Sequence, residues 1–122
     1  GMEAQAERAM SVLAYGDVKR VELALALANQ PRLLLMDEPT AGMAPRERHQ
    51  MMELTRRLAR EQGIGVLFTE HSMDVVFAHA DRIIVLRLGR RVATFQTADA
   101  TTEAVVSAIT GAEVQLPHEE RT

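Results

Sequence analysis

The stretch that decides the fold is Leu33-Leu34-Leu35-Met36-Asp37-Glu38-Pro39. Four apolar residues in a row predict a short strand that is covered on both faces, as the strands of parallel sheets are. The strand stops at a pair of carboxylates, Asp37-Glu38. A second apolar run, 65–69 (GVLFT), is followed in the same way by Glu70-His71. Neighbouring parallel strands end at one edge of a sheet, where ligands bind, so we expect these polar side chains to lie together.

Segments with helical patterns alternate with the apolar runs. This order predicts an α/β fold with a mainly parallel sheet, flanking helices, and a C-terminal β-hairpin and helix. The expected strands are 33–36, 65–69 and a hairpin of 83–86 with 92–95 around Gly89. The expected helices are 18–29, 45–62, a short one from Met73, and one that begins at Thr101 or Thr102 and ends at Gly111. Residues 1–111 are expected to form the domain portion, and the polar tail 112–122 is expected to be disordered.

The chain before the first strand is expected to hold two helices rather than one. Tyr15-Gly16 interrupts the helical pattern, which predicts a short helix over 3–10, a break over 11–17 and a second helix over 18–29. The apolar stripe of the second helix consists of Val21, Leu25 and Ala28, with Ala24 and Leu27 beside it. The helix over 45–62 is expected to bury Met51, Leu54 and Leu58.

Composition narrows the possible functions. The chain has 122 residues, a formal net charge of −3 and no cysteine, which excludes disulfide scaffolds, thiolate zinc sites and thiol nucleophiles. The acidic balance, with one tyrosine, three phenylalanines and no tryptophan, predicts no nucleic-acid partner. The apolar runs are too short to span a membrane, and no signal-peptide core is visible. We therefore expect a soluble intracellular protein.

An apolar strand that ends in two carboxylates suits magnesium and phosphate chemistry. Asp37 can hold the water shell of the ion, and Glu38 can orient or deprotonate an attacking water. A nearby histidine, His71, can hydrogen-bond to a terminal phosphate. Taken alone, Asp37-Glu38 fits the start of a solvated loop equally well, so the residues by themselves leave both interpretations open.

Four motifs in order resemble a known family. Residues 13–17 (LAYGD) resemble the signature motif of ABC transporters, and 33–39 resemble their Walker B motif with its glutamate. Residues 41–44 (AGMA) occupy the position of the family's D-loop, and His71 occupies that of its switch histidine. Over residues 13–95 the chain therefore resembles the ATP-binding subunit of ABC transporters. This resemblance implies part of a P-loop NTPase fold, with ATP and Mg²⁺ as cofactors.

A closer resemblance is to one type of importer. The segments LAYGD, DEPTAGMAP (37–45) and EHSMDVVF (70–77) are similar to importer subunits for branched-chain amino acids and related amides such as urea. Tyr15, Asp17 and Leu25 depart from the general family pattern but fit this importer type, whereas two other departures remain. Ala14 lacks the hydroxyl of the usual signature serine, and Ala44 replaces the usual acid of the D-loop.

The resemblance implies a role for each matched residue. Asp37 holds magnesium through water, Glu38 polarises the attacking water, and His71 contacts the γ-phosphate of ATP. The residues that face ATP bound to the opposite subunit are Ala14, Tyr15, Gly16 and Asp17. They are expected at the amino end of a helix that starts at Val18, where unpaired N–H groups and the helix dipole favour phosphate.

The family's phosphate-binding loop is absent from the 122 residues. That loop is Gly-rich and ends in Gly-Lys-Ser or Gly-Lys-Thr, whereas the single lysine here is Lys19, with no Gly-rich run before it. The chain resembles the carboxyl-terminal portion of the domain and is expected to bind ATP poorly alone; whether it acts as an enzyme stays open. A truncated, catalytically inactive dimerisation or regulatory module is the alternative. A DNA-repair ATPase of the same family is disfavoured, because no heptad pattern is visible.

Partners follow from the importer resemblance and from the first strand. The resemblance implies transmembrane permease subunits and a periplasmic binding protein, and a peripheral place on the cytoplasmic face of the inner membrane. The strand 33–36 lacks the neighbour that it has in the family, and an exposed apolar edge invites pairing. We therefore expect a homodimer or higher oligomer.

Overall fold

The computed structural model describes residues 2–111, with side chains from residue 15 onward. The chain divides into two compact units, Gly1–His79 and Ala80–Thr122. The tail expected to be disordered, 112–122, lies outside the described residues. None of the helices within residues 2–111 is long and apolar enough to cross a lipid bilayer.

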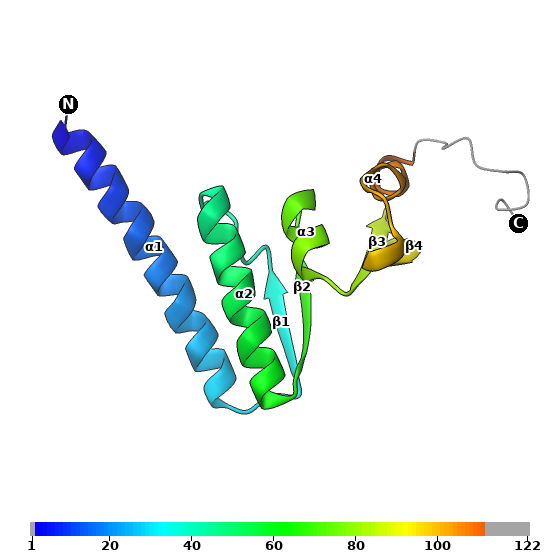
Figure 1. The fold of residues 1–122 in the computed structure, drawn as a ribbon, viewed down its shortest axis with the longest axis horizontal. Coiled ribbons are helices and arrows are strands. Elements are labelled where there is room, and N and C mark those ends of the chain that lie inside the picture. Colours follow the sequence, from blue (N-terminus) through cyan, green and yellow to red (C-terminus); the bar gives the residue numbers. More distant parts are fainter. Residues whose placement is uncertain (1, 112–122) are drawn as a thin grey trace, which may run out of the picture. The chain divides into compact units, whose positions relative to one another are not determined.

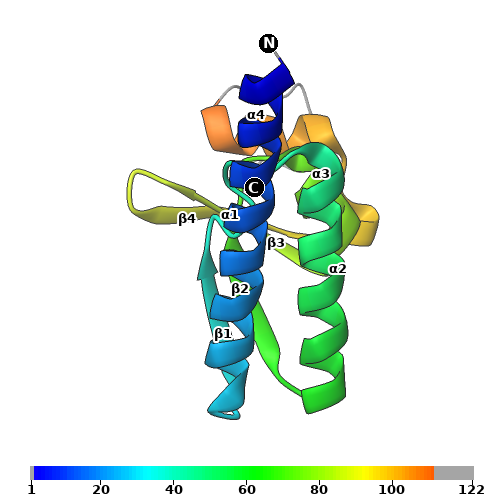
Figure 2. The same cartoon turned by 90° about the vertical axis from the view of Figure 1, so that its left-hand side faces the viewer.

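The first unit is a two-stranded parallel sheet with helices beside it. In chain order it contains α1 (Met2–Ala28), β1 (Leu33–Asp37), α2 (Pro45–Gln62), β2 (Gly65–Thr69) and α3 (Met73–His79). β1 and β2 pair in parallel, from Leu33 opposite Gly65 to Asp37 opposite Thr69. Figure 1 and Figure 2 show α1 and α2 side by side, on the same side of this sheet. The strand–helix–strand order expected from the sequence is therefore present.

α1 is one continuous helix, so the predicted break over 11–17 is wrong. Tyr15 and Gly16 fit inside the helix because a glycine in a helix interior costs only about 1 kcal/mol relative to alanine. Helix-forming residues flank the pair on both sides. Gly16 is also buried, and a Cβ there would lie 4.0 Å from the Glu47 carboxylate of α2. Gly16 thus lies where α1 and α2 approach each other.

The core of the first unit lies between the helices and one face of the sheet. Its buried members are Leu23, Leu27, Leu34, Met43 and Met51, and packed against them are Met36, Leu54, Leu58, Ile64 and Val66. The three residues of α2 that the sequence predicts to be buried all belong to this group. The core therefore joins α1, β1, α2 and β2 in one cluster.

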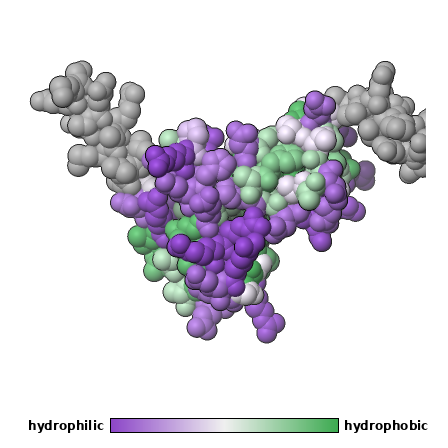
Figure 3. Space-filling view, viewed as in Figure 1, coloured by the Kyte–Doolittle hydropathy of each residue, from purple (hydrophilic) through white to green (hydrophobic). Residues whose placement is uncertain are grey.

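Two apolar faces of the first unit are exposed. The apolar stripe of α1 that the sequence predicts to be packed points away from the core. Its members Val21 and Leu25 are 57% and 65% exposed. Figure 3 shows hydrophobic surface over this part of α1. On the sheet, alternate residues point away from the helices, so Leu33, Leu35 and Leu67 are each more than half exposed. Within the described residues, β1 is covered on one face only, not on both as predicted.

The second unit is a β-hairpin with a helix packed on it. It contains β3 (Arg82–Arg87), β4 (Arg90–Gln96), the short 3-10 helix η1 (Thr97–Asp99) and α4 (Thr102–Thr110). α4 packs on β3, and Ile83, Val85 and Val105 are buried. The hydroxyl of Thr101 accepts the N–H of Ala104 at 3.1 Å and caps α4 as expected. The α/β fold is confirmed, but β3 and β4 form an antiparallel sheet of their own.

The hairpin turn contains a residue that its backbone disfavours. Leu88 and Gly89 link β3 to β4, with φ of 51° and 75°, which is the conformation that favours Asn-Gly. Leu88 is 95% exposed, so Leu88→Asn removes no buried contact. We expect Leu88→Asn to stabilise the chain by about 1 kcal/mol in urea unfolding. Leu88→Val should destabilise it, and a less stable Leu88→Asn chain would contradict this account of the turn.

Two histidines link α2 to the end of α3. Nδ1 of His49 lies 2.9 Å from Nε2 of His79, and the rings are tilted by 44°. Burial lowers the pKa of His79 and the charge of His49 lowers it further, against an opposing effect of Glu53. The hydrogen bond requires a proton on only one of the two facing nitrogens. If both nitrogens carry a proton, the bond is lost.

We expect the stability of the first unit to fall as the pH drops below about 6.5. The folded-state pKa of His79 lies below its unfolded value, so the unfolded chain binds more protons in this range and acid favours it. Urea unfolding at about pH 7.5 and about pH 5.5 measures the effect. The pH dependence should shrink in His49→Gln. A chain that gains stability on acidification over this range would contradict the assignment.

Candidate functional site

The two parallel strands end side by side at one edge of the sheet. Asp37 closes β1, opposite Thr69, which closes β2. Asp37-Glu38 and Glu70-His71 therefore meet at this edge, as the sequence predicts. The carboxyl edge of a parallel sheet is where such folds bind ligands.

Thr69 holds both members of the acidic pair. Its hydroxyl donates to Oδ1 of Asp37 at 2.6 Å and accepts the backbone N–H of Glu38 at 2.9 Å. Glu38 has a φ of 45°, a left-handed conformation that costs a non-glycine residue about 1–2 kcal/mol. The hydrogen bond that the Glu38 N–H donates to Thr69 supports this backbone conformation, from which the Glu38 side chain extends. Sequence reasoning missed Thr69, because the two residues joined by its hydroxyl–carboxylate bond are 32 positions apart.

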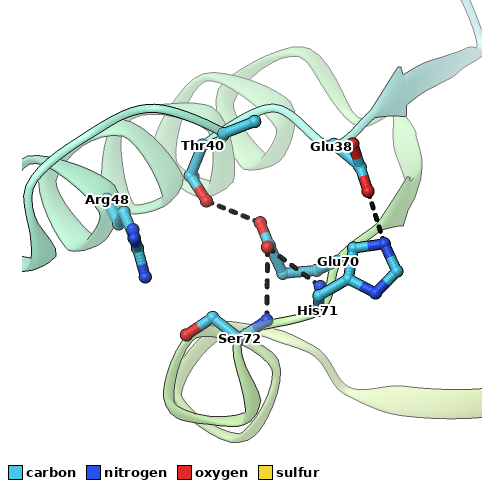
Figure 4. A pocket seen from close by; sticks show the side chains of 7 residues that line it. Glu38, Thr40, Arg48, Glu70, His71 and Ser72 are labelled. Carbon is cyan, nitrogen blue, oxygen red and sulfur yellow. Dashed lines mark hydrogen bonds and ion pairs between the residues drawn. The ribbon is translucent and has the colours of Figure 1, made fainter.

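Glu38 and His71, the two residues predicted as catalytic, lie in direct contact through their side chains. Nε2 of His71 faces Oε1 of Glu38 (Figure 4). The Glu38 side chain is 43% exposed and that of His71 is 85% exposed, so both are accessible to a ligand from solvent. A carboxylate can orient a water, and an imidazole beside it can donate a hydrogen bond to a phosphate.

The contact between Glu38 and His71 borders a hollow of about 480 Å³. The residues that line it are Glu38, Thr40, Ala41, Arg48, Glu70, His71 and Ser72. The Glu70 carboxylate accepts the hydroxyl of Thr40 at 2.6 Å and the N–H of His71 at 3.0 Å. It also accepts the N–H of Ser72 at 3.3 Å. Sequence reasoning gave no role to Thr40, although it lies within segment 37–45, or to Arg48, which belongs to no local pattern that signals a site.

The described residues contain no group of three or more His, Asp or Glu side chains placed to hold a metal ion. Asp37 nevertheless fits the role predicted for it, because its carboxylate is exposed and fixed by Thr69. Mg²⁺ keeps several waters and is held by one or two protein carboxylates together with substrate phosphates. A single oriented carboxylate is therefore the contribution that such a site needs from this edge.

The signature-like residues Ala14–Asp17 lie inside α1 rather than at the start of a helix. Inside a helix the N–H groups bond to carbonyls four residues earlier, so the unpaired N–H groups expected there are wrong for this structure. Tyr15 lies against the loop after β1, since a Cβ on Gly42 would be 3.7 Å from its ring. No hydrogen bond or ion pair among the described side chains joins this segment to the acidic pair or to His71.

Comparison with known proteins agrees with the motifs. The family model described as ABC transporter matches residues 1–41. The chain is 40% identical over 87 residues to the energy-coupling factor transporter ATP-binding protein EcfA2 of Ligilactobacillus salivarius, covering 71% of this chain and 30% of that protein. It is 39% identical over 89 residues to the high-affinity branched-chain amino acid transport ATP-binding protein LivG of Escherichia coli, covering 73% and 35%. The chain thus spans about a third of the length of these relatives.

Comparison of the fold with solved structures supports the same family. The structure is similar to cbiO1 from Clostridium perfringens, part of the ABC transporter complex cbiONQ, with a TM-score of 0.67 and 30% identity. This similarity covers 87% of the chain and 41% of cbiO1. Sequence and fold together identify these residues as part of an ABC transporter ATP-binding domain.

Proposed function

We propose that the chain is part of the ATP-hydrolysing, energy-coupling subunit of an ABC importer. The observation that carries this proposal is the edge at which Glu38 and His71 pair beside Asp37. ATP hydrolysis needs a water oriented toward the terminal phosphate and groups that stabilise the charge on it. The carboxylates and the imidazole at this edge are groups of that kind.

Each residue at the edge has a distinct task in this proposal. Glu38 accepts a hydrogen bond from the attacking water and orients it or takes its proton. His71 donates a hydrogen bond to the γ-phosphate, in exchange for its contact with Glu38. Asp37 holds waters of Mg²⁺, which when bound neutralises phosphate charge. Thr69 holds the Asp37 carboxylate and the backbone of Glu38 in place.

The phosphates need a second binding element outside these 122 residues. The sequence contains no Gly-rich segment ending in Gly-Lys-Ser or Gly-Lys-Thr. We infer that this loop comes from further sequence of the same polypeptide or from a second chain; the chain together with that loop is hereafter the assembled ATPase. In it, Ala14–Asp17 face the ATP of the opposite subunit through their N–H groups, which requires α1 to open ahead of Val18.

The proposed cargo is branched-chain amino acids or related small solutes such as urea. LivG, a branched-chain amino acid transport protein, is among the relatives, and the segments 13–17, 37–45 and 70–77 support the same type. EcfA2, which is named for another kind of transporter, has a similar identity, so the cargo requires a direct test. The proposed partners are transmembrane permease subunits and a periplasmic binding protein, with the chain on the cytoplasmic face of the inner membrane.

ATP turnover in proteoliposomes tests the importer function. The assembled ATPase is reconstituted with its permease subunits, and the binding protein is added with leucine, valine, urea or, as a control, glucose. We expect turnover to rise with a branched-chain amino acid or urea and not with glucose. Turnover that responds to neither the permease nor the loaded binding protein would contradict the importer function.

A non-catalytic dimerisation or regulatory module is the second candidate. The exposed sheet face of Leu33, Leu35 and Leu67 favours it, as does the outer edge of β1, which pairs with no other described strand. If two copies of β1 pair antiparallel about Leu35, Arg32 of one lies opposite Glu38 of the other, which balances charge.

Under either function we propose a homodimer or higher oligomer. Light scattering should give at least twice the chain mass of 13.5 kDa, and a monomer at about 100 μM would contradict the dimer.

A further inference from the structure

Glu70 lies between the two loops that carry the candidate catalytic pair. It follows β2 directly, and its carboxylate points toward the loop after β1 (Figure 4). Oε2 accepts the hydroxyl of Thr40 at 2.6 Å, and Thr40 is only 1% exposed. A short hydrogen bond from a buried hydroxyl to a carboxylate is among the stronger contacts in proteins. One oxygen of Glu70 is therefore anchored in the loop that begins with Glu38.

The other oxygen of Glu70 fixes the backbone ahead of α3. Oε1 accepts the N–H of His71 at 3.0 Å and the N–H of Ser72 at 3.3 Å. The carbonyl of Ser72 in turn accepts the N–H of Val76 at 3.1 Å, which starts the helix. One carboxylate thus bonds both to the loop after β1 and to the backbone of His71.

We propose that Glu70 is a positioning residue that sets the direction in which His71 meets Glu38; the proposal rests on the ATPase function proposed above. The His71 side chain is 85% exposed, so few neighbours restrict it and its direction depends on its backbone. That backbone is held by Glu70. Because Thr40 lies two residues after Glu38, the same carboxylate also limits movement of the Glu38 loop. Glu70 acts through these neighbours and does not touch the reacting atoms.

Substitutions at both ends of the hydrogen bond between Thr40 and Glu70 separate an effect on positioning from an effect on folding. Glu70→Met keeps the length of the side chain without an acceptor, and Thr40→Val keeps its shape without a hydroxyl. Glu70→Gln retains a carbonyl for the N–H groups and an amide that donates to the Thr40 oxygen. Glu61→Gln is the control, because Glu61 is an exposed carboxylate near the far end of α2.

The kcat of the assembled ATPase should show that Thr40 and Glu70 act together as one unit. We expect Glu70→Met and Thr40→Val each to lower kcat roughly tenfold with little change in KM for ATP, as when a reacting group loses its orientation. The double variant should be no worse than Glu70→Met alone, because both changes remove the same contact. Glu70→Gln should restore most of kcat. Additive losses, or wild-type kcat in Glu70→Met, would overturn the proposal.

Amide hydrogen exchange in the 122-residue chain gives a readout that does not depend on ATP. We expect the N–H groups of His71 and Ser72 to exchange about tenfold faster in Glu70→Met and at the wild-type rate in Glu61→Gln. Unchanged exchange in Glu70→Met would also overturn the proposal. If Glu70→Met unfolds the chain, the same test is made by comparing the kcat of Thr40→Val with that of Thr40→Ser, which keeps a hydroxyl. Failure of the ATPase function itself shows separately, as turnover that survives Glu38→Gln.

Discussion

Glu38→Gln is expected to lower ATP turnover by the assembled ATPase roughly 100-fold or more while leaving Mg-ATP bound. Glutamine keeps the size of the side chain at the edge but is a far weaker base and carries no charge to orient the attacking water. Binding should persist because the groups that hold the phosphates are unchanged. Phosphate release measures turnover, and equilibrium dialysis with ATP measures binding.

Glu61→Gln is the matched control for this result. Glu61 is an exposed carboxylate of the same unit, and it lies in the last turn of α2, whereas the site adjoins the first turn. Its turnover should equal that of the wild type. If Glu38→Gln and Glu61→Gln both keep wild-type turnover, Glu38 is not the group that activates water.

Leu27→Ala should lower the free energy of unfolding by about 2–5 kcal/mol, whereas Leu25→Ala should change it by less than about 0.5 kcal/mol. Leu27 is 5% exposed and packs in the core with Leu34, whereas Leu25 is 65% exposed. The two substitutions are chemically identical and lie on the same helix, so intrinsic helix propensity cancels from the comparison. Urea unfolding followed by circular dichroism measures both.

The comparison also reports on partners. Equal losses in Leu27→Ala and Leu25→Ala at low protein concentration would contradict the packing described for α1. A loss in Leu25→Ala that grows with protein concentration would place the exposed stripe of α1 in the interface of an oligomer.

The elements whose signals are local could be predicted from sequence. The run Leu33–Met36 lies within β1, and the run 65–69 matches β2. The helix predicted over 45–62 has those bounds in the structure, since Pro45 suits its first turn and Gly63 ends it with a φ of 66°. Each of these signals involves a few neighbouring residues, and no distant contact competes with it.

α1 shows where local signals are insufficient. Tyr15-Gly16 has the composition of a break, but the flanking residues continue the helix and Gly16 packs near α2. The packed face was also misjudged. In a helix rich in leucine, valine and alanine, several stripes are apolar, and contact with the sheet selects the one that carries Leu23 and Leu27.

The site divides in the same way. Asp37, Glu38 and His71 could be proposed from the sequence because they come just after apolar runs, which is a local pattern. The side-chain bonds from Thr69 to Asp37 and from Thr40 to Glu70 join residues at least 30 positions apart. Threonine and glutamate are common in loops, so only the register of β1 against β2 reveals these contacts.

ATP turnover by the 122-residue chain alone and by the assembled ATPase, each with and without Glu38→Gln, is the decisive measurement. We expect no turnover from the chain alone, because it lacks a loop to hold the phosphates. We expect turnover from the assembled ATPase that Glu38→Gln abolishes. Turnover by the chain alone that survives Glu38→Gln would contradict the assignment, since ATP would then be hydrolysed away from the edge formed by β1 and β2.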